Sequence, residues 1–122
     1  MPPTMERQLQ STYYRVARSK GKWWEGCHAC PPDRKDPKAL LQVHHVIEQQ
    51  TLKRVAKDRK WSQFKLLTVL WDPRNSMLLD ETCHHLHTVK SKRLPISAVS
   101  EAAWEFAAEY DLTDIIVREY RA

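Results

Sequence analysis

The chain has 122 residues, of which 42% are hydrophobic, and a formal net charge of +5. This length fits one small domain, and the apolar content excludes wholesale disorder. No apolar run approaches the length of about eighteen residues that a membrane span needs, and the N-terminus lacks the apolar core of a signal peptide, so we expect a cytoplasmic protein. The positive charge suits a polyanionic partner such as nucleic acid.

A first helix is predicted from Met5 to Lys20, with Thr4 as its N-cap and Gly21 as its C-terminal stop. Several apolar residues of this segment recur at helical spacing, which indicates a stripe that packs against the rest of the domain: Met5, Leu9, Tyr13 and Val16.

Cys27 and Cys30 form a C-x-x-C pair in a turn-like context, with Gly26 before it and two prolines after it. The chain has three cysteines, and this odd number fits a reducing compartment and a metal site better than a set of disulfides. We favour a zinc knuckle over a redox pair, because the βαβ pattern that surrounds redox motifs is absent. Cys27, Cys30 and Cys83 supply three of the four ligands of tetrahedral zinc, and the fourth ligand is open.

An apolar, β-branched run from Ala39 to Ile47 predicts a strand that contains the pair His44 and His45. Neighbours in a strand point to opposite faces, so both imidazoles serve one site only where the strand ends or bends. A helix is expected within 48–60, and its basic residues form either a solvated face or a surface for phosphates: Lys53, Arg54, Lys57, Arg59 and Lys60.

A turn at Trp71–Asn75 leads into a second predicted strand, Ser76–Leu79. Asp80 is a natural N-cap for the helix that follows and that extends past His87. Pro95 breaks the chain after this helix.

The C-terminal part predicts an amphipathic helix capped by Ser97 or Ser100. Its apolar side is formed by Val99, Ala103, Phe106 and Tyr110. A last short turn follows, with Ile115, Ile116 and Tyr120. We expect this tail to cover a small core.

Five of the six histidines fall in two short segments, 44–45 and 84–87, which indicates a site. On the helix that follows Asp80, His84 and His87 share one face, and Cys83 and His87 share an overlapping face. This short helix offers imidazoles to one metal ion and a thiolate to another.

Three stretches together resemble the His-Asn-His (HNH) endonuclease motif of small phage-type proteins: His44-His45-Val46-Ile47, Trp71-Asp72-Pro73-Arg74-Asn75, and Leu78 to Thr88 with Cys83, His84 and His87. The likeness covers about residues 27–88, and the nine-residue step from Asn75 to His84 agrees with the family. It implies an α+β fold with a ββα-metal core, in which two antiparallel strands and a helix hold one divalent ion. The single domain, 1–122, would comprise an N-terminal helix (1–21), a zinc knuckle and core (22–90) and a helical tail (91–122).

The resemblance implies that the chain is an enzyme that hydrolyses phosphodiester bonds in DNA. His45 would be the general base, and Asn75 would hold the base-bearing loop through hydrogen bonds to the backbone. Arg74 and His85 would contact the substrate phosphate, although Arg74 also has a structural alternative.

His44 and His84 would bind the catalytic ion, with His87 or Thr88 as a third ligand. Imidazole-rich sites accept several first-row ions, so Mg²⁺, Mn²⁺, Ni²⁺ and Zn²⁺ all stay open. Beyond DNA, the resemblance suggests phage packaging or recombination proteins as partners and the cytoplasm of a host cell as the location. A monomer and a homodimer are both compatible with it.

The sequence departs from the family at two positions. Glu48 stands where the family usually has a proline, and Asp80 replaces the first cysteine of a second C-x-x-C pair. The fourth zinc ligand is therefore Asp80, His87 or His28, unless the zinc site has been lost.

Two other classes of protein fit the same residues. In the first, the cysteines and the later histidines build one structural zinc centre, and the chain is a non-catalytic, basic DNA-binding module. The residues of that centre would be Cys27, Cys30, Cys83, His84 and His87. An accessory subunit of a phage packaging complex is the other alternative. The adjacent histidine pair and Asn75 favour the nuclease, because a structural zinc centre needs neither.

Overall fold

The computed structural model describes residues 3–20, 27–30, 40–80, 83 and 93–122. Two strands pair in a small sheet, β1 (Leu41–His44) and β2 (Met77–Asp80). Helices make up most of the rest: α1 (Pro3–Lys20), α2 (Gln49–Asp58), α3 (Gln63–Leu70), α5 (Glu101–Glu109) and α6 (Thr113–Glu119), with a 3-10 turn, η3 (Ile96–Ala98). The predicted α+β class is confirmed.

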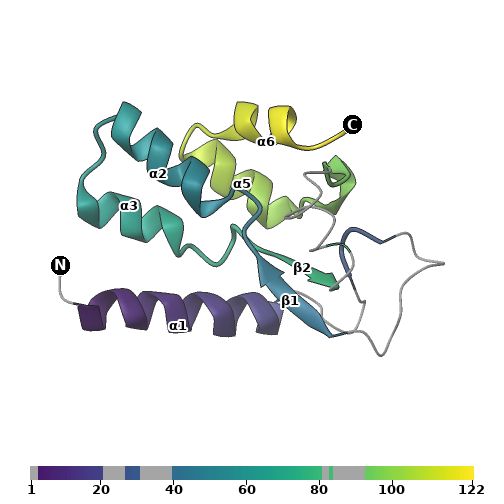
Figure 1. Ribbon diagram of the computed structural model, residues 1–122, viewed down its shortest axis with the longest axis horizontal. Helices are drawn as coiled ribbons and strands as arrows, with labels where there is room; N and C mark the ends of the chain where they lie inside the picture. The colour runs from purple at the N-terminus through teal and green to yellow at the C-terminus, as the bar shows by residue number, and fades with distance from the viewer. Residues whose placement is uncertain (1–2, 21–26, 31–39, 81–82, 84–92) are drawn as a thin grey trace.

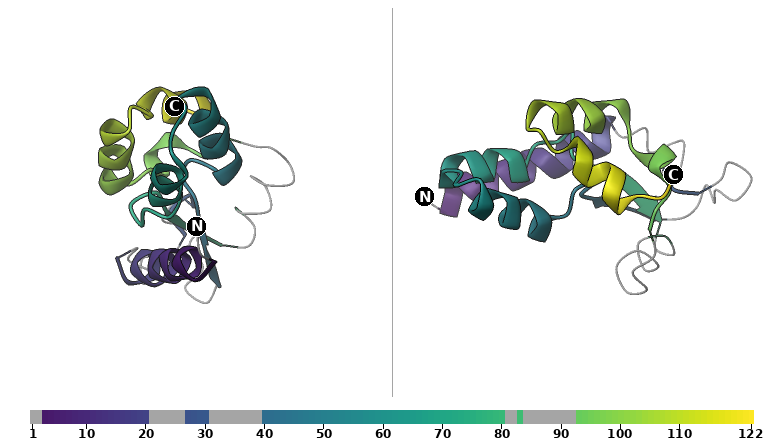
Figure 2. Two further views of the ribbon diagram at one scale, coloured as in Figure 1. Left: turned by 90° about the vertical axis from the view of Figure 1, so that its left-hand side faces the viewer. Right: turned by 90° about the horizontal axis from the view of Figure 1, so that it is seen from above.

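The helices lie around the sheet on more than one side. α1 runs beside β1 and α3 along one side of the molecule, and α5 and α6 lie on the opposite side (Figure 1). The same separation is seen in the end-on view on the left of Figure 2. α2 and α3 pack against each other and form the insertion between the two strands. The sequence predicts a helix at the start of this insertion, and α2 confirms it.

β1 and β2 are antiparallel, with Leu41 opposite Asp80 and His44 opposite Met77. β1 ends earlier than the predicted strand, because the chain bends after His44 and the backbone of Ile47 pairs with a side chain instead of β2. The second strand is shifted by one residue from its predicted position, so that Asp80 is its last residue. The two histidines 44 and 45 therefore lie where the strand ends, the one arrangement in which neighbours can face one site.

Two predicted boundaries in the helical parts need correction, and a third prediction is confirmed in one of its two alternatives. α1 begins at Pro3, so Thr4 lies inside the helix; proline suits the first helical position, where no backbone N–H is needed. Ser100 caps α5 with its hydroxyl, whereas Ser97 lies in η3. The expected last short turn is the seven-residue helix α6.

The core draws on most of these elements. Side chains with no exposure to solvent come from six of them: Tyr13 of α1, Leu52 of α2, Val69 of α3, Leu79 of β2, Phe106 of α5 and Ile116 of α6. The C-terminal tail is thus part of the core, as expected. Among the described segments, no helix combines the length and the apolar character needed to cross a membrane.

Candidate functional site

Two segments that are distant in the sequence bring together Cys27, Cys30, Asp80 and Cys83. The three sulfur atoms and one carboxylate oxygen of this cysteine–aspartate cluster lie within 4.8 Å of one another. A tetrahedral zinc ion with Zn–S distances of about 2.3 Å needs sulfur atoms roughly 3.8 Å apart. The cluster therefore has the composition and the spacing to hold a metal ion such as zinc, with three thiolates and one carboxylate.

Two hydrogen bonds between His28 and Leu78 hold the C-x-x-C turn against β2. The backbone N–H of His28 donates to the carbonyl of Leu78 at 2.8 Å, and the N–H of Leu78 donates to Nδ1 of His28 at 3.2 Å. These two bonds bring the turn to the end of the strand, next to Asp80. His28 has its Nδ1 engaged with the strand and is not a member of the cluster.

The carboxylate of Asp80 contacts both the backbone and the sulfur atoms. Its Oδ1 accepts a hydrogen bond from the Cys83 backbone N–H at 2.8 Å, which is the N-cap contact that the sequence predicts. Its Oδ2 accepts from the Cys30 thiol at 3.1 Å, and the sulfur atoms of Cys30 and Cys83 are 3.4 Å apart. Among the described residues Asp80 is therefore the fourth member of the cluster, and His87 lies outside them.

The electrostatics of the cluster favour the ionised form of Asp80 and the protonated forms of Cys30 and Cys83. Burial alone would raise the pKa of Asp80, but hydrogen bonds from the Cys83 backbone and from the thiols outweigh it and lower that pKa. Burial, and then the hydrogen bond to Asp80, raises the pKa of Cys30 to about 12, and burial also raises the pKa of Cys83. A bound cation would displace these thiol protons, so its affinity would rise with pH.

His45, the expected base, is buried directly after β1, with 6% of its surface exposed. Its Nε2 lies 2.9 Å from the carbonyl oxygen of Leu70. A carbonyl only accepts, so Nε2 carries the proton and Nδ1 is the acceptor nitrogen of the neutral ring. Burial lowers the pKa of His45, although the bond to Leu70 partly opposes this, and the imidazole is therefore neutral at physiological pH.

Asn75 is fully buried in the turn before β2. Its Oδ1 accepts from the Ile47 backbone N–H at 2.8 Å, and its Nδ2 donates to the Ile47 carbonyl at 3.0 Å. Both bonds fix the bend that follows His45. They are the contacts to backbone that the resemblance implies for Asn75, whereas its part in catalysis stays a prediction.

His44 and His45 line a surface pocket of about 310 Å³ together with the start of α2 and with Tyr14 and Val43. A larger cavity of about 750 Å³ lies between α1, β2 and α5, but neither of these two imidazoles lines it. The two imidazoles that the resemblance makes metal ligand and general base thus line the smaller pocket, whereas the larger cavity is lined by other titratable groups such as His28 and Glu105. The other predicted members of this site, His84, His85 and His87, lie outside the described residues, as does Thr88.

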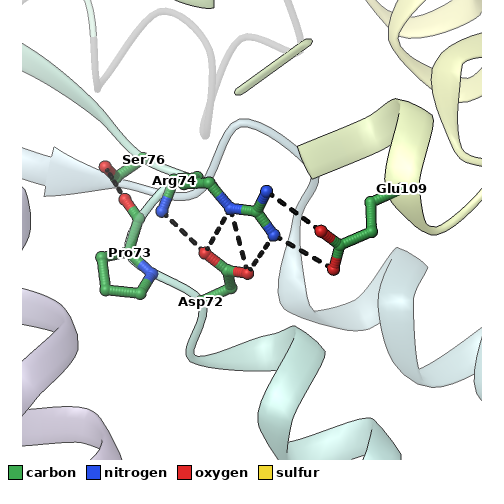
Figure 3. Close-up of polar contacts among 5 residues, drawn as sticks. All are labelled: Asp72, Pro73, Arg74, Ser76 and Glu109. Carbon is green, nitrogen blue, oxygen red and sulfur yellow. Dashed lines mark hydrogen bonds and ion pairs between the residues drawn. The ribbon is translucent and has the colours of Figure 1, made fainter. Parts of the chain in front are cut away.

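Arg74, which the resemblance assigned to the phosphate, is held by two carboxylates in Figure 3. Its Nη2 lies 2.7 Å from Asp72 and 3.3 Å from Glu109, and its guanidinium lies over the Phe106 ring at 5.8 Å. The hydrogen bond to Asp72 raises the pKa of Arg74. These contacts favour the structural alternative, in which Arg74 joins the turn before β2 to α5.

One basic residue of the 48–60 segment is also tied to the fold. Arg59 donates to the carbonyls of Tyr110 and Asp111 at 2.9 and 2.8 Å. Three basic residues of α2 are exposed and fit either a solvated face or a phosphate surface: Lys53, Arg54 and Lys57.

Sequence reasoning treated Tyr13 only as a packing residue. In the structure its ring stacks on His45 and its hydroxyl donates to the Asn75 carbonyl at 2.7 Å. The helical stripe in the sequence indicates that Tyr13 is buried, but it carries no information about which residue the ring meets.

Comparison with protein-family models, with curated proteins and with solved structures finds no match for this chain. A function must therefore be argued from its own residues and their geometry.

Proposed function

We propose that this protein is a metal-dependent DNA endonuclease of the HNH type. In this proposal β1, β2 and the helix capped by Asp80 form a ββα-metal core. The pocket of His44 and His45 would be the active site, and the cysteine–aspartate cluster would be a structural zinc site at the far end of β2. The substrate would be a DNA phosphodiester.

The observation that carries the proposal is the combination of a buried, neutral His45 with an Asn75 that binds the bend beside it. Asn75 uses both ends of its amide on Ile47, two residues after His45. A structural zinc module gains nothing from this arrangement, whereas a general base needs a fixed position relative to its substrate.

His45 would take the proton of the attacking water on its Nδ1 atom. Its Nε2–H stays on the Leu70 carbonyl, which selects the tautomer whose Nδ1 is basic. Attack of this water on the phosphorus breaks the bond to the leaving 3′ oxygen. A divalent ion held by His44, with His84 and His87 as the further expected ligands, would supply positive charge for the phosphate and the leaving oxygen.

The cysteine–aspartate cluster would stabilise the fold without taking part in the chemistry. It joins the C-x-x-C turn to Asp80 at the end of β2 and to Cys83. In a domain of this size a structural metal contributes to folding directly.

The deciding experiment is the nicking of supercoiled plasmid in the presence of Mg²⁺, Mn²⁺, Ni²⁺ or Zn²⁺, with the metal content of the purified protein measured alongside. The His45→Ala variant should lose nicking while it keeps its helical circular dichroism and its zinc. His28→Gln is the matched control, because it removes an imidazole outside the pocket and keeps a polar atom for the Leu78 N–H; it should nick DNA normally.

Three results would contradict the proposal. Full nicking by a folded His45→Ala variant would show that His45 is not the general base. DNA binding without cleavage under every ion would support the zinc-containing DNA-binding module instead. Weak cleavage by the protein alone that a partner protein stimulates would support the accessory subunit.

A further inference from the structure

Tyr13 lies on α1, outside the segment 27–88 that resembles the nuclease motif, and is fully buried. Its ring stacks on the His45 imidazole, with centroids 4.6 Å apart and planes inclined by 15°. Trp71 meets the same imidazole edge-on at 5.4 Å, and the carbonyl of Leu70 accepts from Nε2. The imidazole is therefore confined by an aromatic face, an aromatic edge and one hydrogen bond.

The hydroxyl of Tyr13 reaches the second residue of the proposed site. It donates to the backbone carbonyl of Asn75 at 2.7 Å, across 62 positions of the sequence. Burial raises the pKa of Tyr13, so the hydroxyl keeps its proton and stays a donor at physiological pH. One phenol thus contacts His45 through its ring and Asn75 through its oxygen.

We propose that Tyr13 is a positioning residue that keeps the His45 imidazole in one orientation and one tautomer. The inference rests on the proposed function, because the fixed orientation matters for catalysis only if His45 is the base. Rotating the ring by half a turn would replace the Nε2–H at the Leu70 carbonyl with a C–H and lose the hydrogen bond. Tilting the ring is opposed by the flat, closely packed face of Tyr13.

The two contacts of Tyr13 can be separated by substitution. Tyr13→Phe keeps the stacked ring and removes only the bond to Asn75. Tyr13→Leu fills part of the same space with a branched aliphatic group, which has no flat face against the imidazole. Phe106→Leu is the matched control, because it also removes a fully buried aromatic ring, and that ring contacts Tyr110 and not His45.

The first readout needs no DNA. In wild-type protein and in Tyr13→Phe, the ¹⁵N shifts of the His45 ring should show a single tautomer with the proton on Nε2. In Tyr13→Leu the two nitrogens should shift toward each other, as expected for a mixture of tautomers. In Phe106→Leu the wild-type pattern should persist, although the protein is less stable.

The second readout is nicking, measured well below the melting temperature of each variant. We expect Tyr13→Leu to lower kcat by about 10- to 100-fold, the effect of a misplaced catalytic group. KM should stay within about twofold of the wild-type value, because Tyr13 does not touch the substrate. Tyr13→Phe should keep most of the wild-type kcat, because it retains the stacked ring. If Tyr13→Leu does not fold, Tyr13→Met, which is longer and more adaptable, takes its place under the same criteria.

The inference is overturned if the leucine or methionine variant keeps a single His45 tautomer, or if its kcat falls no further than that of Phe106→Leu. Absence of nicking by the wild-type protein would reject the proposed function and not this inference, because the ¹⁵N shifts still report whether Tyr13 orients the ring.

Discussion

Asn75 and Ile47 exchange two hydrogen bonds although they are 28 positions apart, one at 2.8 Å and one at 3.0 Å. The side-chain amide of Asn75 pairs with the Ile47 backbone as a neighbouring strand would: it accepts from the Ile47 N–H and donates to the Ile47 carbonyl. These bonds join the bend after β1 to the turn before β2. The Asn75 side chain therefore fixes the backbone that follows His45.

Replacing Asn75 with Ala should lower the free energy of unfolding by about 3 kcal/mol, because it leaves a buried N–H and a buried carbonyl without partners. Urea denaturation measures the loss. Ser76→Ala is a suitable control, since it removes one partly buried hydrogen bond, from the Ser76 hydroxyl to the Pro73 carbonyl, and should cost about 1 kcal/mol. Equal losses in the two variants would show that the Asn75 bonds contribute no more than an ordinary turn contact.

Local sequence patterns predict some features of this structure and not others. The Asp80 cap and the helix α2 follow from residue types and spacings within a few positions, and the sequence predicts both. The Asn75 carbonyl lies 62 positions from Tyr13, and Glu109 lies 35 positions from Arg74. These contacts depend on how the helices pack and not on any local spacing, unlike the contact of Arg74 with Asp72, two positions away. The role of Arg74 was for this reason assigned from the resemblance, which carries no information about Glu109.

The cysteine–aspartate cluster gives a second prediction. Asp80→Asn keeps an oxygen that can cap the helix but removes the negative charge and the better metal ligand. We expect the purified protein to contain one zinc per chain, and Asp80→Asn to weaken zinc binding by more than the roughly 10- to 100-fold typical of residues that contact a metal ligand but not the metal. Competition with a chromophoric chelator measures the affinity.

Removal of zinc from the wild-type protein should lower its melting temperature, and Cys27→Ala should show the lower temperature from the start. Addition of chelator should then have little further effect on that variant. Identical zinc affinities in wild-type protein and Asp80→Asn would show that Asp80 serves only as the helix cap.

Burial of neutral His45 predicts how stability depends on pH. Its pKa in the folded state is lower than in the unfolded chain, where it is about 6.5, so below that pH the unfolded chain binds the proton first. This contribution to stability is complete above about pH 6.5 and is lost as the pH falls toward the folded-state pKa. Unfolding free energies measured from pH 8 to pH 5 should therefore decline more steeply for wild-type protein than for His45→Gln. Parallel curves would mean that His45 titrates normally in the folded protein.

The two roles of Arg74 predict different results for Arg74→Gln. If Arg74 joins Asp72 to Glu109, as its distances indicate, the variant should lose about 1 to 2 kcal/mol of stability and bind DNA as before. If it binds a phosphate, DNA affinity should fall and the slope of log affinity against log salt should decrease by about 1. Fluorescence anisotropy with a labelled duplex at several salt concentrations separates the two, with Arg118→Gln as a control for the loss of an exposed positive charge elsewhere. We expect Arg74→Gln and Arg118→Gln to give the same salt slope and to differ only in stability.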